Sequence, residues 1–119
     1  MNRLFDYLIH MQHAATDACA FAAGMSKGEF LADKRTQQAI VMSIIIIGEA
    51  ATKVTDKHSA FVEKHPDVPW RSMRGMRSRI AHGYFDINLD LVWDTVQTAL
   101  PDLLHRIEHI LPDAGDDEA

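Results

Sequence analysis

Apolar residues recur every three or four positions along most of the chain, and this period restricts the possible folds more than any other feature. Residues 2–23 show it in a run of apolar and small residues: Leu4, Leu8, Met11, Ala15, Ala18, Cys19 and Ala22. Such spacing puts these side chains on one face of an amphipathic helix. No segment alternates with the two-residue period of a half-buried strand. The sequence therefore predicts an all-α protein.

The run Ile44–Ile47 is the one segment whose own residues favour a strand, because β-branched residues have high strand propensity. Its flanks, residues 37–38 and 49–53, are rich in helix formers, and the helical spacing continues through them. We therefore predict one long helix over about residues 33–55. Gly48 inside it costs about 1 kcal/mol relative to alanine. We expect this glycine to permit a close approach to the Ala-rich face of the first helix.

Glycine, proline and capping signals divide the rest of the chain. Ser26 and Glu29 have the spacing of a capping box, which opens a short helical turn. The further expected elements are a short helix over 59–64, a helix from about 67 to 80 and a long helix from 88 or 89 to 111. Pro101 lies inside the last of these and should kink it, because it removes one backbone hydrogen bond. The predicted fold is an antiparallel bundle of four principal helices with short extra helices.

A chain of 119 residues is the size of one domain. We place this domain at residues 1–111 and interpret residues 112–119, half of which are acidic, as a disordered tail. No purely apolar stretch is longer than six residues, so we expect no membrane span. The N-terminus lacks the apolar core of a secretory signal. We expect a cytoplasmic protein without membrane contact.

The metal-ligating residue types are few and poorly spaced. A single cysteine, Cys19, excludes an internal disulfide and a multi-cysteine zinc site. His10 with His13 and His105 with His109 have helical spacing, but neither pair has a third ligand at a suitable distance in the sequence. We interpret them as exposed helix residues, and we expect no metal and no cofactor.

Basic residues are concentrated at one place. The formal net charge is −5, from 12 Lys and Arg against 17 Asp and Glu. Four of the seven arginines nevertheless fall within nine positions: Arg71, Arg74, Arg77 and Arg79. A non-specific nucleic-acid binder would be basic overall. This distribution indicates instead one local site for an anionic ligand.

Arg77 and His82, with four residues between them, pair a permanent cation with a side chain that titrates near neutral pH. Histidine can act as general base or acid, and arginine can bind a phosphate and stabilise the charge that develops on its oxygens. RNA carries its own nucleophile, the 2′-hydroxyl, so a metal-free ribonuclease needs little more than this pair. Taken alone, the two residues also fit a helix C-terminus, where cations stabilise the macrodipole.

The sequence Arg77-x4-His82-x-Tyr84 resembles the Arg-x4-6-His motif of HEPN ribonucleases, in the extended form of HepT-like toxins. Four further landmarks of that family follow the same order: Phe30-Leu31-Ala32-Asp33 with Thr36-Gln37, Ile47-Gly48-Glu49-Ala50, His65-Pro66 to Trp70, and Val92-Trp93 to Leu100-Pro101. The resemblance covers the chain from about Leu4 to Leu111.

This resemblance implies a HEPN-like homodimer, in which two motifs meet in one cleft and cleave RNA without metal through Arg77 and His82. It also implies a cognate nucleotidyltransferase antitoxin of the MntA type, with which the toxin can form a higher assembly. That antitoxin would transfer AMP to Tyr84 and silence the toxin. One residue departs from the family's pattern: Ser78 stands where asparagine is most common, and a hydroxyl reaches less far than an amide.

The roles of several neighbouring residues stay open. Ser78, Arg74 and Arg79 are candidates for supporting RNA binding, although the arginines also fit a solvated helix face. Glu49 can form an i,i+4 pair with Lys53, or it can orient a motif arginine across the cleft. The function also has an alternative: a catalytically silent HEPN module that serves a nucleotidyltransferase as partner or substrate. Tyr84 is either the residue that is modified or a buried aromatic residue whose hydroxyl has a hydrogen-bond partner.

Overall fold

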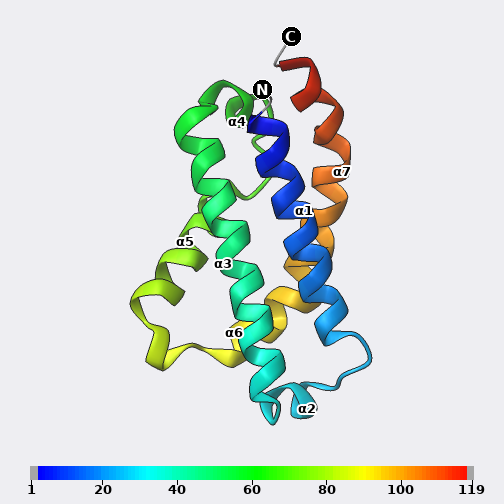
Figure 1. Cartoon of the computed structure of the whole chain (residues 1–119), viewed down its shortest axis with the longest axis vertical. Coiled ribbons are helices and arrows are strands. Elements are labelled where there is room, and N and C mark those ends of the chain that lie inside the picture. The colour runs from blue at the N-terminus through cyan, green and yellow to red at the C-terminus, as the bar shows by residue number, and fades with distance from the viewer. Residues whose placement is uncertain (1–2, 118–119) are drawn as a thin grey trace.

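The computed structural model describes residues 3–117, and the side chains of Ala81, Tyr84, Asp116 and Asp117 lie outside that description. The regular elements of the described residues are all helical (Figure 1). In chain order they are α1 Arg3–Ala22, α2 Lys27–Leu31, α3 Lys34–Lys57, α4 Ser59–Lys64, α5 Trp70–His82, η1 Tyr84–Asp86, α6 Leu89–Asp94, η2 Thr95–Ala99 and α7 Leu100–Asp117. The all-α prediction is confirmed.

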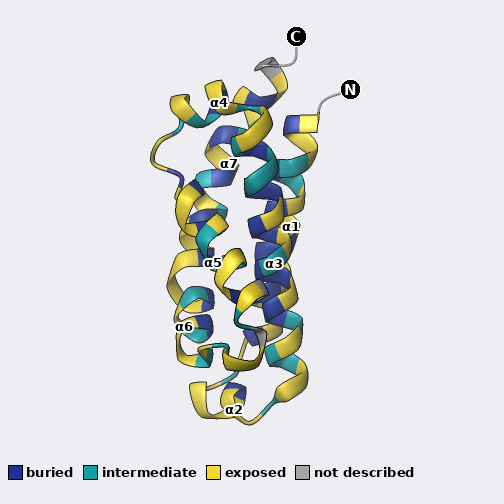
Figure 2. Ribbon diagram, turned by 90° about the vertical axis from the view of Figure 1, so that its left-hand side faces the viewer, coloured by how far each residue is buried: buried dark blue, intermediate teal, exposed yellow. Residues whose placement is uncertain are grey.

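The long helix α3 packs along α1 on one side and along α5 on the other, while α7 packs against α1. In Figure 1, α5 runs beside α3 in the opposite direction, and the start of α1 and the end of α7 lie at the same end of the molecule. The outward faces of the helices are largely exposed, and the inward faces are buried (Figure 2). The central position of α3 allows it to present residues to α5, which carries the Arg-x4-His motif.

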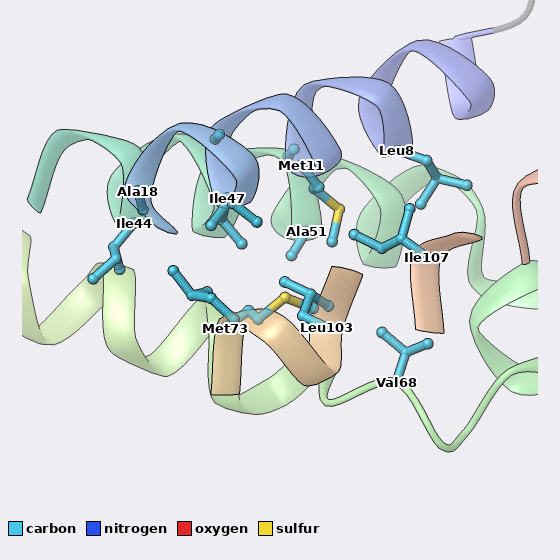
Figure 3. Packing of buried hydrophobic residues seen from close by; sticks show 14 of the residues in the cluster. Leu8, Met11, Ala18, Ile44, Ile47, Ala51, Val68, Met73, Leu103 and Ile107 are labelled. Atoms are coloured by element: carbon cyan, nitrogen blue, oxygen red, sulfur yellow. The ribbon is translucent and has the colours of Figure 1, made fainter. Parts of the chain in front are cut away.

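The core follows the helical period that the sequence shows. Leu8 and Met11 from α1 meet Ala51 from α3 and Leu103 and Ile107 from α7, and each side chain is buried (Figure 3). Burial of this kind stabilises the fold by about 25 cal/mol per Å² of apolar surface. The core therefore joins three long helices that are distant in sequence.

The isoleucine run is helical, as predicted. Ile44 and Ile47 are buried, whereas Ile46 is 41% exposed, because successive residues of a helix point in different directions. The helix begins at its N-cap Asp33, whose carboxylate accepts hydrogen bonds from the Thr36 backbone N–H at 3.2 Å and from the Thr36 hydroxyl at 2.8 Å. These hydrogen bonds lower the pKa of Asp33.

The predicted capping box is present at the start of α2. The Glu29 N–H donates to the Ser26 hydroxyl at 3.1 Å, and the Ser26 N–H donates to the Glu29 carboxylate at 2.8 Å. The irregularity expected at Pro101 takes the form of the π-helical segment η2 just before it. There the Leu100 N–H donates to the Thr95 carbonyl.

The boundary of the acidic tail differs from the prediction. We expected disorder from Pro112, but α7 continues through it to Asp117. A proline in a helix interior costs about 3 kcal/mol. Contacts beyond it favour the helical path: Ala114 is fully buried, and the Asp113 carboxylate lies 3.3 Å from His65 Nε2.

Among the described residues, one helix, α3, is long and apolar enough to cross a membrane by length and composition alone. This helix has 24 residues and is apolar enough to pass that test. Half of its most apolar window is buried inside the protein, and core helices of soluble proteins pass the same test. The purely apolar run is short, but the apolar period continues past Gly48 and Glu49.

Candidate functional site

Helix α5 carries the motif and is fixed to the body by its apolar face. Trp70, Met73 and Ile80 are buried, and the Trp70 indole N–H donates to the His65 carbonyl at 3.0 Å. The helix begins at Trp70 rather than near residue 67, because the preceding residues form a turn in which the Val68 N–H donates to His65. It ends where the Gly83 N–H donates to the Arg79 carbonyl at 2.9 Å. The motif therefore occupies the last turns of a well-anchored helix.

Gly48 meets α5, not the first helix as we expected. A Cβ atom at Gly48 would lie 2.2 Å from Arg77 Cβ and 2.9 Å from the Met73 carbonyl oxygen. Both distances are far below van der Waals contact, so only glycine fits at this position without movement of α5. The expected close approach is present, but its partner is the motif helix. The sequence showed the glycine without showing which helix it faces.

Glu49, the next residue of α3, forms an ion pair with Arg77. The Glu49 Oε2 atom lies 2.7 Å from Arg77 Nη2, and the two side chains are 49% and 36% exposed. Of the two roles left open for Glu49, the structure shows contact with the motif arginine, and that arginine belongs to the same chain. An ion pair this exposed contributes only about 0–1 kcal/mol to stability.

Arg77 and His82 leave α5 in different directions. Five positions along a helix turn it by about 140° and advance it by about 7.5 Å. Arg77 is half-buried against α3, whereas His82 is exposed at the last residue of the helix. The structure therefore places both residues at the surface, but on different sides of α5.

The three candidate supporting residues, Arg74, Ser78 and Arg79, do not lie together: they line two different pockets beside α5. Arg74 and Ser78 line an open groove of about 690 Å³ between α5 and the α3–α4 region, and Arg74 Nη2 lies 3.7 Å from Asp56 Oδ1. Arg79 lines a smaller pocket of about 160 Å³ on another side of α5. Ser78 is exposed and faces that groove with Arg74. The side chain of Tyr84 lies outside the described residues, and its backbone begins η1 directly after Gly83.

An exposed apolar surface lies beside the motif helix, and sequence reasoning missed it. Phe85, Met42 and Ile46 are 96%, 57% and 41% exposed. Phe85 and Met42 line a groove of about 600 Å³ between α3 and the segment that follows α5. The helical spacing of Met42, Ile46 and Glu49 could have indicated it, because this spacing puts two apolar residues on the same face of α3 as Glu49.

Among residues 3–117, no group of three or more His, Cys, Asp and Glu side chains could hold a metal ion. The His105 and His109 rings lie 4.5 Å apart, and His109 Nδ1 lies 2.9 Å from the His105 carbonyl oxygen.

Burial raises the pKa of the Cys19 thiol.

The all-helical fold, with Arg77 and His82 at the surface, is consistent with a HEPN domain. The chain matches the family described as "HepT-like: Ribonuclease HepT-like" over residues 11–110. A Methanocaldococcus jannaschii protein named as an RNase is 38% identical over 116 residues, which are 97% of this chain and 90% of that protein. A Thermococcus cleftensis protein named as a ribonuclease HepT is 33% identical over 105 residues, which are 88% and 93% of the two chains. No solved structure matches the chain. The protein belongs to the HepT-like ribonuclease family, as the motif indicates.

Proposed function

We propose that this protein is a metal-independent endoribonuclease, the toxin of a HEPN–nucleotidyltransferase toxin–antitoxin system, and that it acts on RNA in the cytoplasm. The observation that carries the proposal is the accessible Arg77 guanidinium on a helix that ends in an exposed histidine. A guanidinium can bind phosphate oxygens with several N–H donors, and an accessible imidazole can exchange a proton with a substrate.

The reaction needs one proton acceptor and one cation. His82 takes the proton of the 2′-hydroxyl, and the resulting oxyanion attacks the adjacent phosphorus. The bond from phosphorus to the 5′-oxygen of the next nucleotide then breaks, that oxygen takes a proton from water, and His82 returns its proton to the solvent. The products are a 2′,3′-cyclic phosphate and a 5′-hydroxyl. Arg77 stabilises the charge that builds on the non-bridging phosphate oxygens.

A second copy of the chain would complete the site. Arg77 and His82 of one chain point to different sides of α5, so two motifs related by a two-fold axis can surround one phosphate from both sides. The exposed Met42, Ile46 and Phe85 lie beside the motif helix and supply apolar surface that such a dimer would bury.

Regulation would act on Tyr84, two residues after His82. An MntA-type nucleotidyltransferase would transfer AMP from ATP to its hydroxyl and release pyrophosphate. The added phosphate would compete with RNA for Arg77 by charge and by volume. Tyr84→Phe keeps the ring and removes the acceptor, so cleavage should persist and inhibition by the partner should disappear. Mass spectrometry after co-expression locates the adduct. An adduct on Tyr7, or inhibition without any adduct, would contradict this mode of silencing.

The direct test of the proposed function is RNA cleavage in the presence of a chelator. His82→Ala should lower the rate by about 10²–10⁴-fold, the usual contribution of a general base. Arg77→Lys should also be strongly impaired, because an ammonium does not reproduce the guanidinium fork.

Two matched substitutions control for these variants. His109→Ala removes another exposed helical histidine, and Arg35→Lys makes the same change at an exposed arginine of α3; both should cleave like the wild type. Cleavage that requires Mg²⁺ and survives His82→Ala would refute the mechanism. A wild-type protein without cleavage that still binds the nucleotidyltransferase would favour the silent binding module.

A further inference from the structure

We propose that Glu49 is a positioning residue for Arg77: it holds the guanidinium in the orientation in which its remaining N–H groups can receive a phosphate. This inference rests on the proposed function and assigns a role to a residue outside the Arg-x4-His motif. Glu49 would not touch the substrate. It would act only through the arginine that does.

Helix α3 holds Arg77 at both ends of its side chain. At the base, the absence of a side chain on Gly48 lets Arg77 Cβ and Cγ lie directly against the α3 backbone. At the tip, Glu49 Oε2 lies 2.7 Å from Nη2 in an ion pair. An arginine side chain has many rotamers, and contacts at its base and at its tip select few of them. Two consecutive residues of α3 therefore determine where the guanidinium points.

The ion pair leaves donors for a ligand. Arginine has five N–H donors in a planar fork, and the ion pair joins Glu49 Oε2 to Nη2. The Nε and Nη1 atoms carry the other donors, and the Arg77 side chain is 36% exposed. The guanidinium can thus keep its carboxylate partner while it binds a phosphate oxygen.

The direction in which the loss of the Glu49 charge changes RNA binding and kcat distinguishes a positioning role from a purely electrostatic one. A negative charge beside Arg77 weakens the general attraction of the site for an anion, so its removal alone would improve RNA binding. If Glu49 positions Arg77, its removal instead lowers the rate of the bound complex, because misplacement by about 1 Å can cost 10²-fold in rate. We therefore expect Glu49→Gln to lower kcat by about 10- to 100-fold while KM stays the same or falls.

A second pair between the same two helices supplies the matched control. Asp56 of α3 and Arg74 of α5 lie 3.7 Å apart, and both side chains are more than 40% exposed. Asp56→Asn also removes one negative charge from α3, but its partner is Arg74 and not the motif arginine Arg77. It should change kcat by less than about twofold. Glu49→Asp retains the charge on a shorter side chain, and it should recover part of the lost rate.

The experiment measures kcat and KM for RNA cleavage in a chelator with wild type, Glu49→Gln, Glu49→Asp, Asp56→Asn, Arg77→Lys and the double variant Glu49→Gln/Arg77→Lys. A positioning role predicts that Glu49→Gln adds little to Arg77→Lys, because both changes act on one group. Unchanged or higher kcat in Glu49→Gln, or an equal further loss in the Arg77→Lys background, would overturn the proposal.

A second readout does not depend on cleavage. The Arg77 Nε–Hε resonance, assigned by its loss in Arg77→Lys, should lie apart from those of exposed arginines in the wild type and in Asp56→Asn. It should move towards them in Glu49→Gln. A wild type that fails to cut RNA refutes the proposed function, whereas an Arg77 resonance insensitive to Glu49→Gln refutes the positioning role.

Discussion

Replacement of Gly48 by alanine tests the contact between α3 and the motif helix. The added Cβ would lie 2.2 Å from Arg77 Cβ and 2.9 Å from Arg77 Cγ and the Met73 carbonyl oxygen. Carbon atoms in contact are about 3.5–4.0 Å apart, so α5 must move away by roughly 1 Å or more. The neighbours are backbone or the base of a side chain and cannot rotate aside.

The cost can be set against the gain in helix propensity. Overpacking of a core costs about 1–3 kcal/mol, and this contact belongs at the upper end. Alanine returns about 1 kcal/mol because it favours the helix over glycine. The net loss is about 2 kcal/mol. For a chain of this length the unfolding entropy is about 0.25 kcal/mol/K, so Tm should fall by about 8 °C.

Gly75→Ala is the control for this substitution. It lies on α5, and a Cβ atom there meets nothing within 4 Å. It should therefore stabilise the protein by up to about 1 kcal/mol. Urea unfolding followed by circular dichroism measures both variants, and chelator-resistant cleavage by folded Gly48→Ala should fall because Arg77 moves with α5. A Gly48→Ala protein as stable as Gly75→Ala would refute the reasoning about this contact.

Two further predictions concern acid stability and assembly. Hydrogen bonds from Thr36 lower the folded-state pKa of Asp33, so this carboxylate stabilises the fold above about pH 4 and that contribution is lost as the pH falls through the lowered pKa. Asp33→Asn does not titrate, and its urea midpoint should change less than that of the wild type between pH 6 and pH 2.5; parallel curves would contradict this. Light scattering should give twice the 13.4 kDa mass of one chain, and a monomer that persists at high concentration would refute the dimer.

The helices were predictable because their determinants are local. The run Ile44–Ile47 could be recognised as helical from its flanks, and the capping box from two residues at a fixed spacing. The features that were not predicted depend on contacts between residues that are distant in the sequence. The extension through Pro112 depends on the burial of Ala114, and the partner of Gly48 depends on the helix that packs beside it.

The site was predictable as a set of residues but not as a geometry. A motif names Arg77 and His82, and their separation along the helix already implies different directions. The ion pair of Arg77 with Glu49 joins residues 28 positions apart in the sequence, and it depends on how closely α3 and α5 approach. Local sequence patterns do not report that distance.

The central claim is that His82 and Arg77 cleave RNA through its own 2′-hydroxyl. Mass spectrometry of the ends produced from a defined RNA in the presence of a chelator tests this most directly. We predict a 2′,3′-cyclic phosphate on one fragment and a 5′-hydroxyl on the other, both formed about 10²–10⁴-fold more slowly by His82→Ala. Fragments with a 3′-hydroxyl and a 5′-phosphate would contradict it, because a water molecule rather than the 2′-hydroxyl would then have attacked the phosphorus.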